Sequence, residues 1–185
     1  MLLWIKGAFS PQEIRRKLMD GDSAFQKALT EYLENVQVGE FLTGTMSDVR
    51  KKIPVHSQED RNNYKDPTQV LPIPPPACCV NKEECTSKND CIDWQLRYKD
   101  TVDDLIIRSN IHSCCGCQNS EGVCTARFPR MVVPITTVNQ EDGSLQVKKL
   151  EPMINNVSPV VTYLMRCNTD VTSLLSGTAI KAIVA

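Results

Sequence analysis

Hydrophobic positions near the start of the chain form first a continuous run and then a helical pattern. Residues 2–5 are all apolar, and because the run is too short for a helix we expect a buried strand. Ser10, Pro11 and Glu13 follow as an N-cap, a first-turn proline and a capping-box glutamate. They predict a helix that continues to about Met19.

A second helix and then a polar segment are predicted after Gly21. Apolar residues recur there at three- to four-residue spacing, the pattern of an amphipathic helix with one buried face, and Gly39 is a natural stop. Residues 47–70 are polar without periodicity, and the prolines of 71–76 favour an extended polyproline conformation. We therefore expect a linker over 47–77. The apolar positions of the helix are Phe25, Leu29, Tyr32, Leu33 and Val36.

The second half of the chain predicts a helix, a hairpin, a strand and a last helix. A helix of about four turns is expected to begin near Cys91, because the apolar residues that follow fall on one face. Apolar segments at 131–135 and 145–147 flank a polar turn, which predicts a hairpin. Residues 160–167 predict a strand, and Asp170 is expected to cap an amphipathic helix. The one-sided apolar positions of the first helix are Trp94, Tyr98, Val102, Leu105 and Ile106, and those of the last are Leu174, Leu175, Ile180, Ile183 and Val184.

Composition narrows the class of protein. The chain has 185 residues, a formal charge of −1 and 41% hydrophobic residues, as expected of one ordinary soluble α+β domain. The near-neutral charge excludes a strongly basic nucleic-acid binder, although a local basic patch remains compatible with it. No apolar run approaches the roughly 18 residues that cross a bilayer, so we expect no membrane partner. Residues 1–7 lack the features of a secretion signal, and we expect an intracellular protein.

Nine cysteines are present, and eight of them lie between positions 78 and 124. In a reducing compartment such clustering indicates metal ligands rather than disulfides. One imidazole and several thiolates within a short stretch supply the soft donors that tetrahedral zinc requires. The neighbouring Cys114 and Cys115 compete for one position, and the two-residue spacing to Cys117 favours Cys114. The predicted ligands of this group are His112, Cys114, Cys117 and Cys124.

The earlier cysteines form a looser group with five-residue gaps that fit no standard zinc finger. They would supply a second zinc ion or complete a shared one, and the alternative for either group is free cysteines in a loop. The ligands predicted here are Cys79, Cys85 and Cys91, with Cys78 as the alternative to Cys79. Cys167 stands alone in an apolar stretch, where we expect a small buried hydrophobe.

Two further features bear on chemistry. Glu121 is the only carboxylate between His112 and Cys124, and nothing marks it as an acid or base, so we expect a structural rather than a catalytic zinc. Arg127 and Arg130 flank Phe128, an arrangement that would hold a phosphate backbone and stack a base. The alternative is a solvated turn in which the phenyl ring packs against the zinc lobe.

Residues 103–114 (DDLIIRSNIHSC), 124–130 (CTARFPR) and 166–171 (RCNTDV) resemble the Rep portion of Helitron rolling-circle transposases, in particular the fungal copies. Residues 1–7 and 38–41 match the same portion upstream, so the resemblance covers essentially the whole chain.

The resemblance implies descent from proteins that nick and join single-stranded DNA. Family members use a divalent metal on a His-hydrophobe-His strand, a tyrosine pair on a later helix and a C-terminal helicase. In the family the histidine pair directly precedes the segment that matches residues 1–5, and the tyrosine pair directly follows the one that matches 179–185. This chain contains neither pair and no helicase phosphate loop, so we expect a fragment without catalytic residues or a catalytic metal site.

Two features of the family remain in this chain under the resemblance, namely the zinc lobe and contact with DNA. His112, Cys114, Cys117 and Cys124 match the family's His/Cys motif. The resemblance further implies weak contact with single-stranded DNA through Arg127 and Arg130, the remainder of the transposase as a partner, and a nuclear location.

The expected organisation is an incomplete Rep-nuclease-like α+β core with an inserted zinc lobe. Residues 1–46 would supply the first strand and helices, 47–77 the linker, 78–130 the cysteine-rich lobe with its helix, and 131–185 the hairpin, strand and last helix. A hypothesis of another class is a stand-alone zinc-stabilised module whose helices dock a protein partner.

Overall fold

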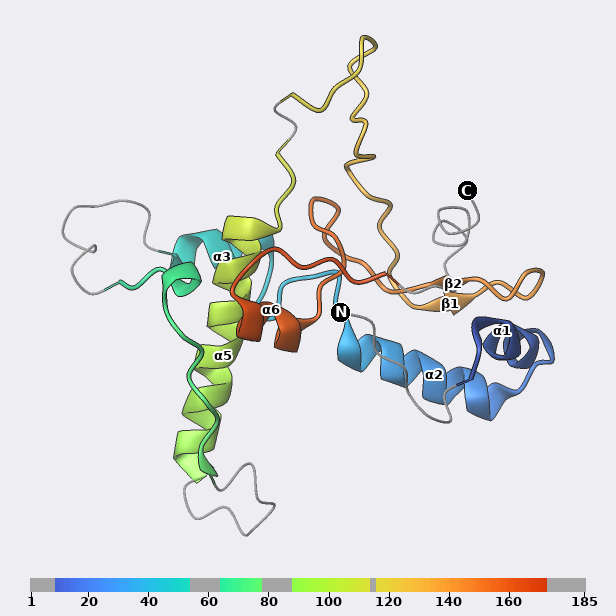
Figure 1. The fold of residues 1–185 in the computed structure, drawn as a ribbon, viewed down its shortest axis with the longest axis horizontal. Coiled ribbons are helices and arrows are strands. Elements are labelled where there is room, and N and C mark those ends of the chain that lie inside the picture. Colours follow the sequence, from blue (N-terminus) through green and yellow to red (C-terminus); the bar gives the residue numbers. More distant parts are fainter. Residues whose placement is uncertain (1–8, 54–63, 78–87, 114–115, 173–185) are drawn as a thin grey trace.

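The computed structural model describes residues 9–53, 64–77, 88–113 and 116–172 (Figure 1). These residues form a mixed structure of helices and one small antiparallel sheet, which agrees with the predicted α+β class. The elements are α1 (Pro11–Met19), α2 (Ser23–Val36), α3 (Met46–Lys52), the 3-10 turn η2 (Pro67–Gln69), α5 (Lys88–Ser109), β1 (Thr137–Val138), β2 (Leu145–Gln146) and α6 (Pro159–Met165).

The first two helices begin where the sequence predicted them. The Ser10 side chain accepts from the Glu13 amide, and the Glu13 carboxylate accepts from the Ser10 amide, so both halves of the capping box are present. Asp22 caps α2 through the Phe25 amide at 3.0 Å. Both helix predictions are confirmed in this part of the chain.

The predicted linker differs from the structure at its start. Thr45 and Asp48 form a second capping box, and α3 follows it over Met46–Lys52. Val49 on this helix is 2% exposed and belongs to the main hydrophobic cluster. Helix α3 therefore packs on the core through Val49, with Met46 partly buried against it. The helix is too short to produce a visible apolar period, and its capping box was the signal that the composition concealed.

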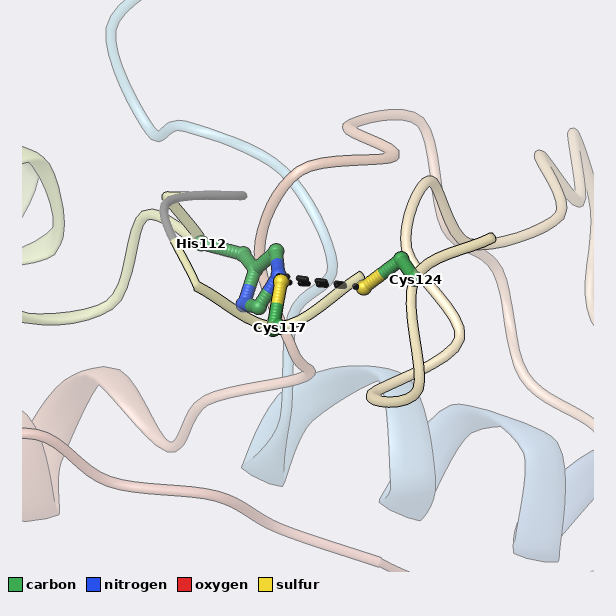
Figure 2. Close-up of side chains that lie close together, drawn as sticks. All are labelled: His112, Cys117 and Cys124. Carbon is green, nitrogen blue, oxygen red and sulfur yellow. Dashed lines mark hydrogen bonds between the residues drawn. The ribbon is translucent and has the colours of Figure 1, made fainter. Parts of the chain in front are cut away.

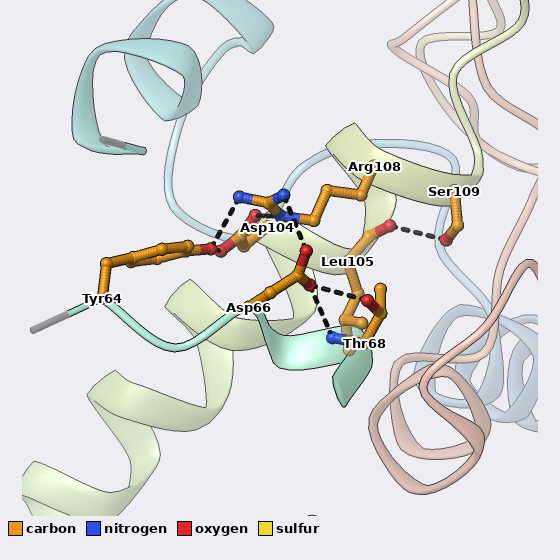
Figure 3. A network of polar contacts seen from close by, with 7 residues as sticks. All are labelled: Tyr64, Asp66, Thr68, Asp104, Leu105, Arg108 and Ser109. Atoms are coloured by element: carbon orange, nitrogen blue, oxygen red, sulfur yellow. Dashed lines mark hydrogen bonds and ion pairs between the residues drawn. The ribbon is translucent and has the colours of Figure 1, made fainter. Parts of the chain in front are cut away.

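A polar network fixes the next part of the predicted linker against α5 (Figure 3). The Arg108 guanidinium donates to Asp104 at 2.6 Å and to Asp66 at 3.1 Å. The Tyr64 hydroxyl donates to Asp104 and accepts from Arg108. Burial, together with the hydrogen bond to Asp104, raises the pKa of the Tyr64 phenol. Asp66 also caps η2 by accepting from Thr68, so residues 64–69 are held in place.

Helix α5 is longer than predicted, and apart from Cys91 its buried residues lie in its second half. It spans Lys88–Ser109, and its fully buried apolar residues, Val102, Leu105 and Ile106, lie near its C-terminal end. The predicted apolar face is confirmed there. Trp94 and Tyr98, nearer the start, are only half buried.

The predicted strand over 160–167 is wrong, because residues 160–165 belong to helix α6 instead. Ser158 caps it by accepting from the Val161 amide, and Pro159 occupies the first turn. The apolar run resembled a strand, yet only Thr162 and Tyr163 on this helix are buried. The prediction of a buried Cys167 is also wrong, because this residue follows the helix on an exposed segment.

The predicted hairpin is confirmed, with its paired residues shifted toward the turn. Thr137 pairs with Gln146 and Val138 with Leu145. A separate bridge joins Val133 to Lys149, so the first predicted segment touches the ladder at one residue. Gly143, with φ of 64°, occupies a left-handed position in the turn.

Two hydrophobic clusters organise the fold. The first joins α3, α5 and α6 with the segments around residues 41 and 154–157, and the second packs the hairpin on α1 and α2. The antiparallel bridge between Val38 and Val157 brings the segment that follows α2 into the first cluster. The buried members of the first are Phe41, Val49, Val102, Ile106, Ile154, Val157 and Tyr163, and those of the second are Leu18, Leu33 and Leu145.

Two predicted elements, the strand at 2–5 and the helical positions from 174 onward, lie outside the described residues. Among the described residues, no helix has the length and apolar character needed to cross a membrane.

Candidate metal centre

The backbone of His112 is attached to the main core. The chain leaves α5 after Ser109, and the His112 amide donates to the Met153 carbonyl at 2.8 Å. The next residue, Ile154, is fully buried in the main cluster. After His112 the chain continues into a loop that projects away from the helices (Figure 1).

Cys117 and Cys124 face each other across a tight turn. The Asn119 amide donates to the Val123 carbonyl at 2.9 Å, and the Asn119 side chain accepts from the Val123 amide at 2.9 Å. The Thr125 amide closes the turn by donating to the Cys117 carbonyl at 2.7 Å. Gly122, with φ of 76°, supplies the left-handed residue that the turn requires. Asn119 was not predicted to matter, although asparagine commonly organises turns in this way.

Three of the four donors predicted for this group, His112, Cys117 and Cys124, converge (Figure 2). The His112 Nε2 atom lies 3.2 Å from the Sγ atoms of both Cys117 and Cys124, and the two sulfurs are 3.5 Å apart. In a tetrahedral zinc site, bond lengths of about 2.3 Å to sulfur and 2.0–2.1 Å to nitrogen place two sulfurs about 3.8 Å apart and sulfur about 3.6 Å from nitrogen. Each side of the triangle would lengthen by only a few tenths of an ångström, so the donors fit a metal ion of this size.

The surroundings of Cys124 favour a thiolate, which is the form that binds metal. Its pKa is lowered to about 7, chiefly by the backbone amide of Phe128, with Cys117, the Ala126 amide and His112 also contributing. The side chain is 8% exposed, so this sulfur is largely shielded from solvent.

One wall of the centre is a stack of planar side chains. The Phe128 ring lies parallel to the His112 imidazole, with centroids 4.1 Å apart and planes at 7°. The Arg130 guanidinium lies 4.4 Å from the Phe128 centroid and donates to Asn155 at 3.0 Å. Phe128 is therefore covered by His112 and Arg130 and is not open to stack a base. The structure adopts the alternative, in which the phenyl ring packs against the lobe.

The other predicted site residues have varied positions. Arg127 is exposed, with a left-handed φ of 62°, and Glu121 is exposed in the turn. Cys91 is buried in the first turn of α5 and is disulfide-bonded, so its role as a metal ligand requires the reduced form and stays a prediction. Predicted ligands outside the described residues are Cys79, Cys85 and Cys114, as are the alternatives Cys78 and Cys115.

No protein-family model, curated protein or solved structure matches this chain at a significant level.

Proposed function

We propose that this chain is a zinc-stabilised, non-catalytic module of a Helitron-type DNA-transposition protein. The convergence of His112, Cys117 and Cys124 carries the proposal. Cys114 would be the fourth ligand, because its two-residue spacing to Cys117 suits a zinc knuckle. Zinc would supply a cross-link between the end of α5 and the 117–124 turn, a structural role that lends its binding energy to folding.

The surroundings of the centre support a structural metal. A catalytic zinc keeps an open position beside an acid or base, whereas Glu121 is exposed and the His112 ring is covered by Phe128. The described tyrosines near the core also serve in packing. Tyr64 bonds to Asp104, Tyr98 stacks on Trp94, and Tyr163 bonds to the Ile73 backbone, so none is placed as a free nucleophile.

The Helitron assignment rests on the sequence resemblance and on the His/Cys group it shares. Under this proposal the two helical groups correspond to a Rep-like core from which the zinc lobe projects. Single-stranded DNA would be contacted on the exposed side of the lobe by Arg127, with Arg130 held behind it by Phe128 and Asn155.

The first experiment measures zinc in the purified full chain by elemental analysis. We expect near-stoichiometric zinc in the parent protein and in Cys167→Ala, which removes an exposed cysteine far from the cluster in sequence. Cys124→Ala and His112→Ala should each reduce bound zinc at least tenfold, because each leaves the ion with an incomplete ligand set. A metal-free parent protein, or retention of zinc by both ligand variants, would contradict the proposal.

The second experiment measures binding of fluorescein-labelled single-stranded DNA at several salt concentrations. If Arg127 contacts one phosphate, Arg127→Ala should reduce the slope of log affinity against log salt by about 0.7, whereas Arg97→Ala should not. Arg97 is exposed on α5 and donates to its own helix backbone, which makes it a matched control. Equal slopes for both variants would remove the DNA-contact part of the proposal.

A second candidate function is a protein-interaction module, and one observation favours it. Helix α6 presents apolar side chains to solvent on its outer face, an arrangement typical of interaction surfaces. These are Val160, Val161, Leu164 and Met165, between 44% and 64% exposed. Zinc content without single-stranded DNA binding at low salt would favour this function over the first.

A further inference from the structure

The proline-rich segment 71–76 runs alongside the first half of α5 (Figure 1). It is anchored through the backbone of one residue, Ile73. The Trp94 indole Nε1 donates to the Ile73 carbonyl at 3.0 Å. The Tyr163 hydroxyl accepts from the Ile73 amide at 3.1 Å and donates to its carbonyl at 2.8 Å. The Ile73 side chain itself is 57% exposed, so the grip is on the main chain.

Three aromatic rings from two helices form the surface under this segment. Trp94 and Tyr98 of α5 stack with centroids 5.3 Å apart, and Tyr163 of α6 lies 4.9 Å from Tyr98 and 6.2 Å from Trp94. We call these three side chains the aromatic groove. An open cleft of about 810 Å³ continues beside it, between the prolines and the outer face of α6. Its remaining apolar lining comes from Pro72, Pro74, Pro75, Val160 and Leu164.

This combination matches the physical requirements for reading a polyproline helix. A polyproline helix has no internal hydrogen bonds, so its backbone carbonyls are available to outside donors. Domains that bind such segments use aromatic-lined grooves and benefit from the low conformational entropy of the ligand. Trp94 and Tyr163 supply donors, and the rings supply flat apolar surface for the pyrrolidines. The contacts are to the backbone of Ile73, and one of them uses its amide hydrogen, so another proline-rich segment with a non-proline residue at this position would satisfy them equally.

We propose that the aromatic groove is a recognition site for proline-rich segments in the polyproline II conformation, occupied in this structure by the chain's own residues 71–76. A proline-rich peptide of a partner protein competes for the same donors and rings. The internal segment acts at an effective concentration on the order of millimolar. A partner can bind only while the groove is empty, so its apparent dissociation constant is its intrinsic one divided by the fraction of molecules whose groove is empty. This inference does not depend on the metal centre.

The test uses full-length protein and a labelled peptide with the sequence of residues 70–77, VLPIPPPA. In a released variant, residues 71–76 are replaced by alternating glycine and serine. We expect the released variant to bind the peptide at least about tenfold more tightly than the parent chain in fluorescence anisotropy, because the competing segment is gone. Circular dichroism and urea unfolding check that the variant is folded.

Two point variants made in the released background locate the binding site. Trp94→Phe keeps a ring but removes the indole donor, and it should reduce peptide affinity at least fivefold. Leu96→Ala, an exposed position on the same helix that does not line the cleft, should bind as the released variant does. Absence of peptide binding by a folded released variant, or equal affinities for these two point variants, would overturn the proposal.

A milder change guards against a released variant that does not fold. Pro74→Gly combined with Pro75→Gly keeps Ile73 and its hydrogen bonds but removes the stiffness of the internal segment. Both prolines are exposed, so the core is unaffected. We expect peptide affinity between those of the parent and released proteins, and affinity equal to the parent's would count against the proposal.

Discussion

Gly39 occupies a position where the structure has no room for a Cβ atom. The Gly39 carbonyl accepts from the Leu150 and Glu151 amides, which brings the chain against the 149–156 segment. A Cβ atom there would lie 2.7 Å from the Asn156 Oδ1 atom and 3.0 Å from the Lys149 Cα atom. The sequence suggested Gly39 as a helix stop, whereas its main constraint is this close approach.

Gly39→Ala should therefore lower the free energy of unfolding by about 1–3 kcal/mol, the usual cost of overpacking. Asn156→Ala removes one of the two obstructing groups and should recover part of this loss in a double-mutant cycle measured by urea unfolding. Gly21→Ala is the control, because Gly21 has a φ of +74° with open space around it and its cost should not couple to Asn156. Coupling of equal size at both glycines would contradict this explanation.

Lys149 is a second residue on which the surroundings act, in this case through the pKa of its ammonium group. Burial, with repulsion from Arg130, lowers the pKa of its ammonium group to about 8. The unfolded chain has a lysine pKa of about 10.4, so between these values the unfolded state binds the proton and the folded state does not. The free energy of unfolding should therefore rise with pH across this window and be unaffected by this group below it.

Lys149→Met should remove this part of the pH dependence. Between pH 7.5 and pH 10, we expect the free energy of unfolding of the parent protein to increase by on the order of 2 kcal/mol more than that of the variant. Urea unfolding of both proteins at each pH measures the difference, which cancels the titration of groups they share. Parallel pH profiles would show that Lys149 keeps its ordinary pKa.

At the scale of elements, helix-capping residues marked the starts of the short helices better than runs of hydrophobic residues did. Helices α1 and α3 both begin with complete capping boxes, and α6 begins with a serine cap and a first-turn proline. The apolar pattern identified α2 and the buried half of α5, where helices are long enough to repeat it. In short helices the pattern is too brief to separate a helix from a strand, so the cap was the better signal at 158–159.

The attachment of residues 64–69 to α5 gives an element-scale prediction. Arg108→Met should cost about 2 kcal/mol, because it leaves the Asp104 and Asp66 carboxylates without their cation in a partly buried site. Lys52→Ala breaks the more exposed pair with Asp100, which joins α3 to α5, and should cost less than about 1 kcal/mol. Chemical unfolding of both variants gives the comparison, and similar costs would show that the Arg108 network adds no more than a surface pair.

At the scale of the whole molecule, the metal centre is joined to the main core by backbone hydrogen bonds. His112 donates to Met153, and Arg130 donates to Pro152, on either side of the lobe. Ile154, next to these acceptors, is fully buried with Val157. The lobe is therefore attached to the core at both of its ends.

Zinc should accordingly stabilise the fold as a whole. At a free zinc concentration 100 times the dissociation constant, mass action adds about 2.7 kcal/mol, which corresponds to a rise in Tm of about 5–10 °C for a chain of this size. Differential scanning calorimetry with zinc and with a chelator measures the shift, and His112→Ala should abolish it while Cys167→Ala should not. An unchanged Tm in the parent protein would mean that the lobe unfolds independently or binds no metal.

The sequence by itself determined the local features. Capping residues, helical periodicity and turn residues depend on neighbours within about four positions, so α1, α2, the buried face of α5 and the hairpin could be predicted from the chain alone. The donor types at 112, 117 and 124 were also legible, because zinc chemistry restricts which side chains can serve.

Only the tertiary structure decided which surfaces are covered. Burial depends on residues far apart in the chain. For this reason Cys167 proved exposed and Val49 proved buried. The Phe128 ring likewise proved to be covered by His112 and Arg130. The proline-rich segment has the composition of a linker, yet its backbone meets donors from α5 and α6. No local pattern encodes such a meeting, because it arises only when long-range packing brings separate elements together.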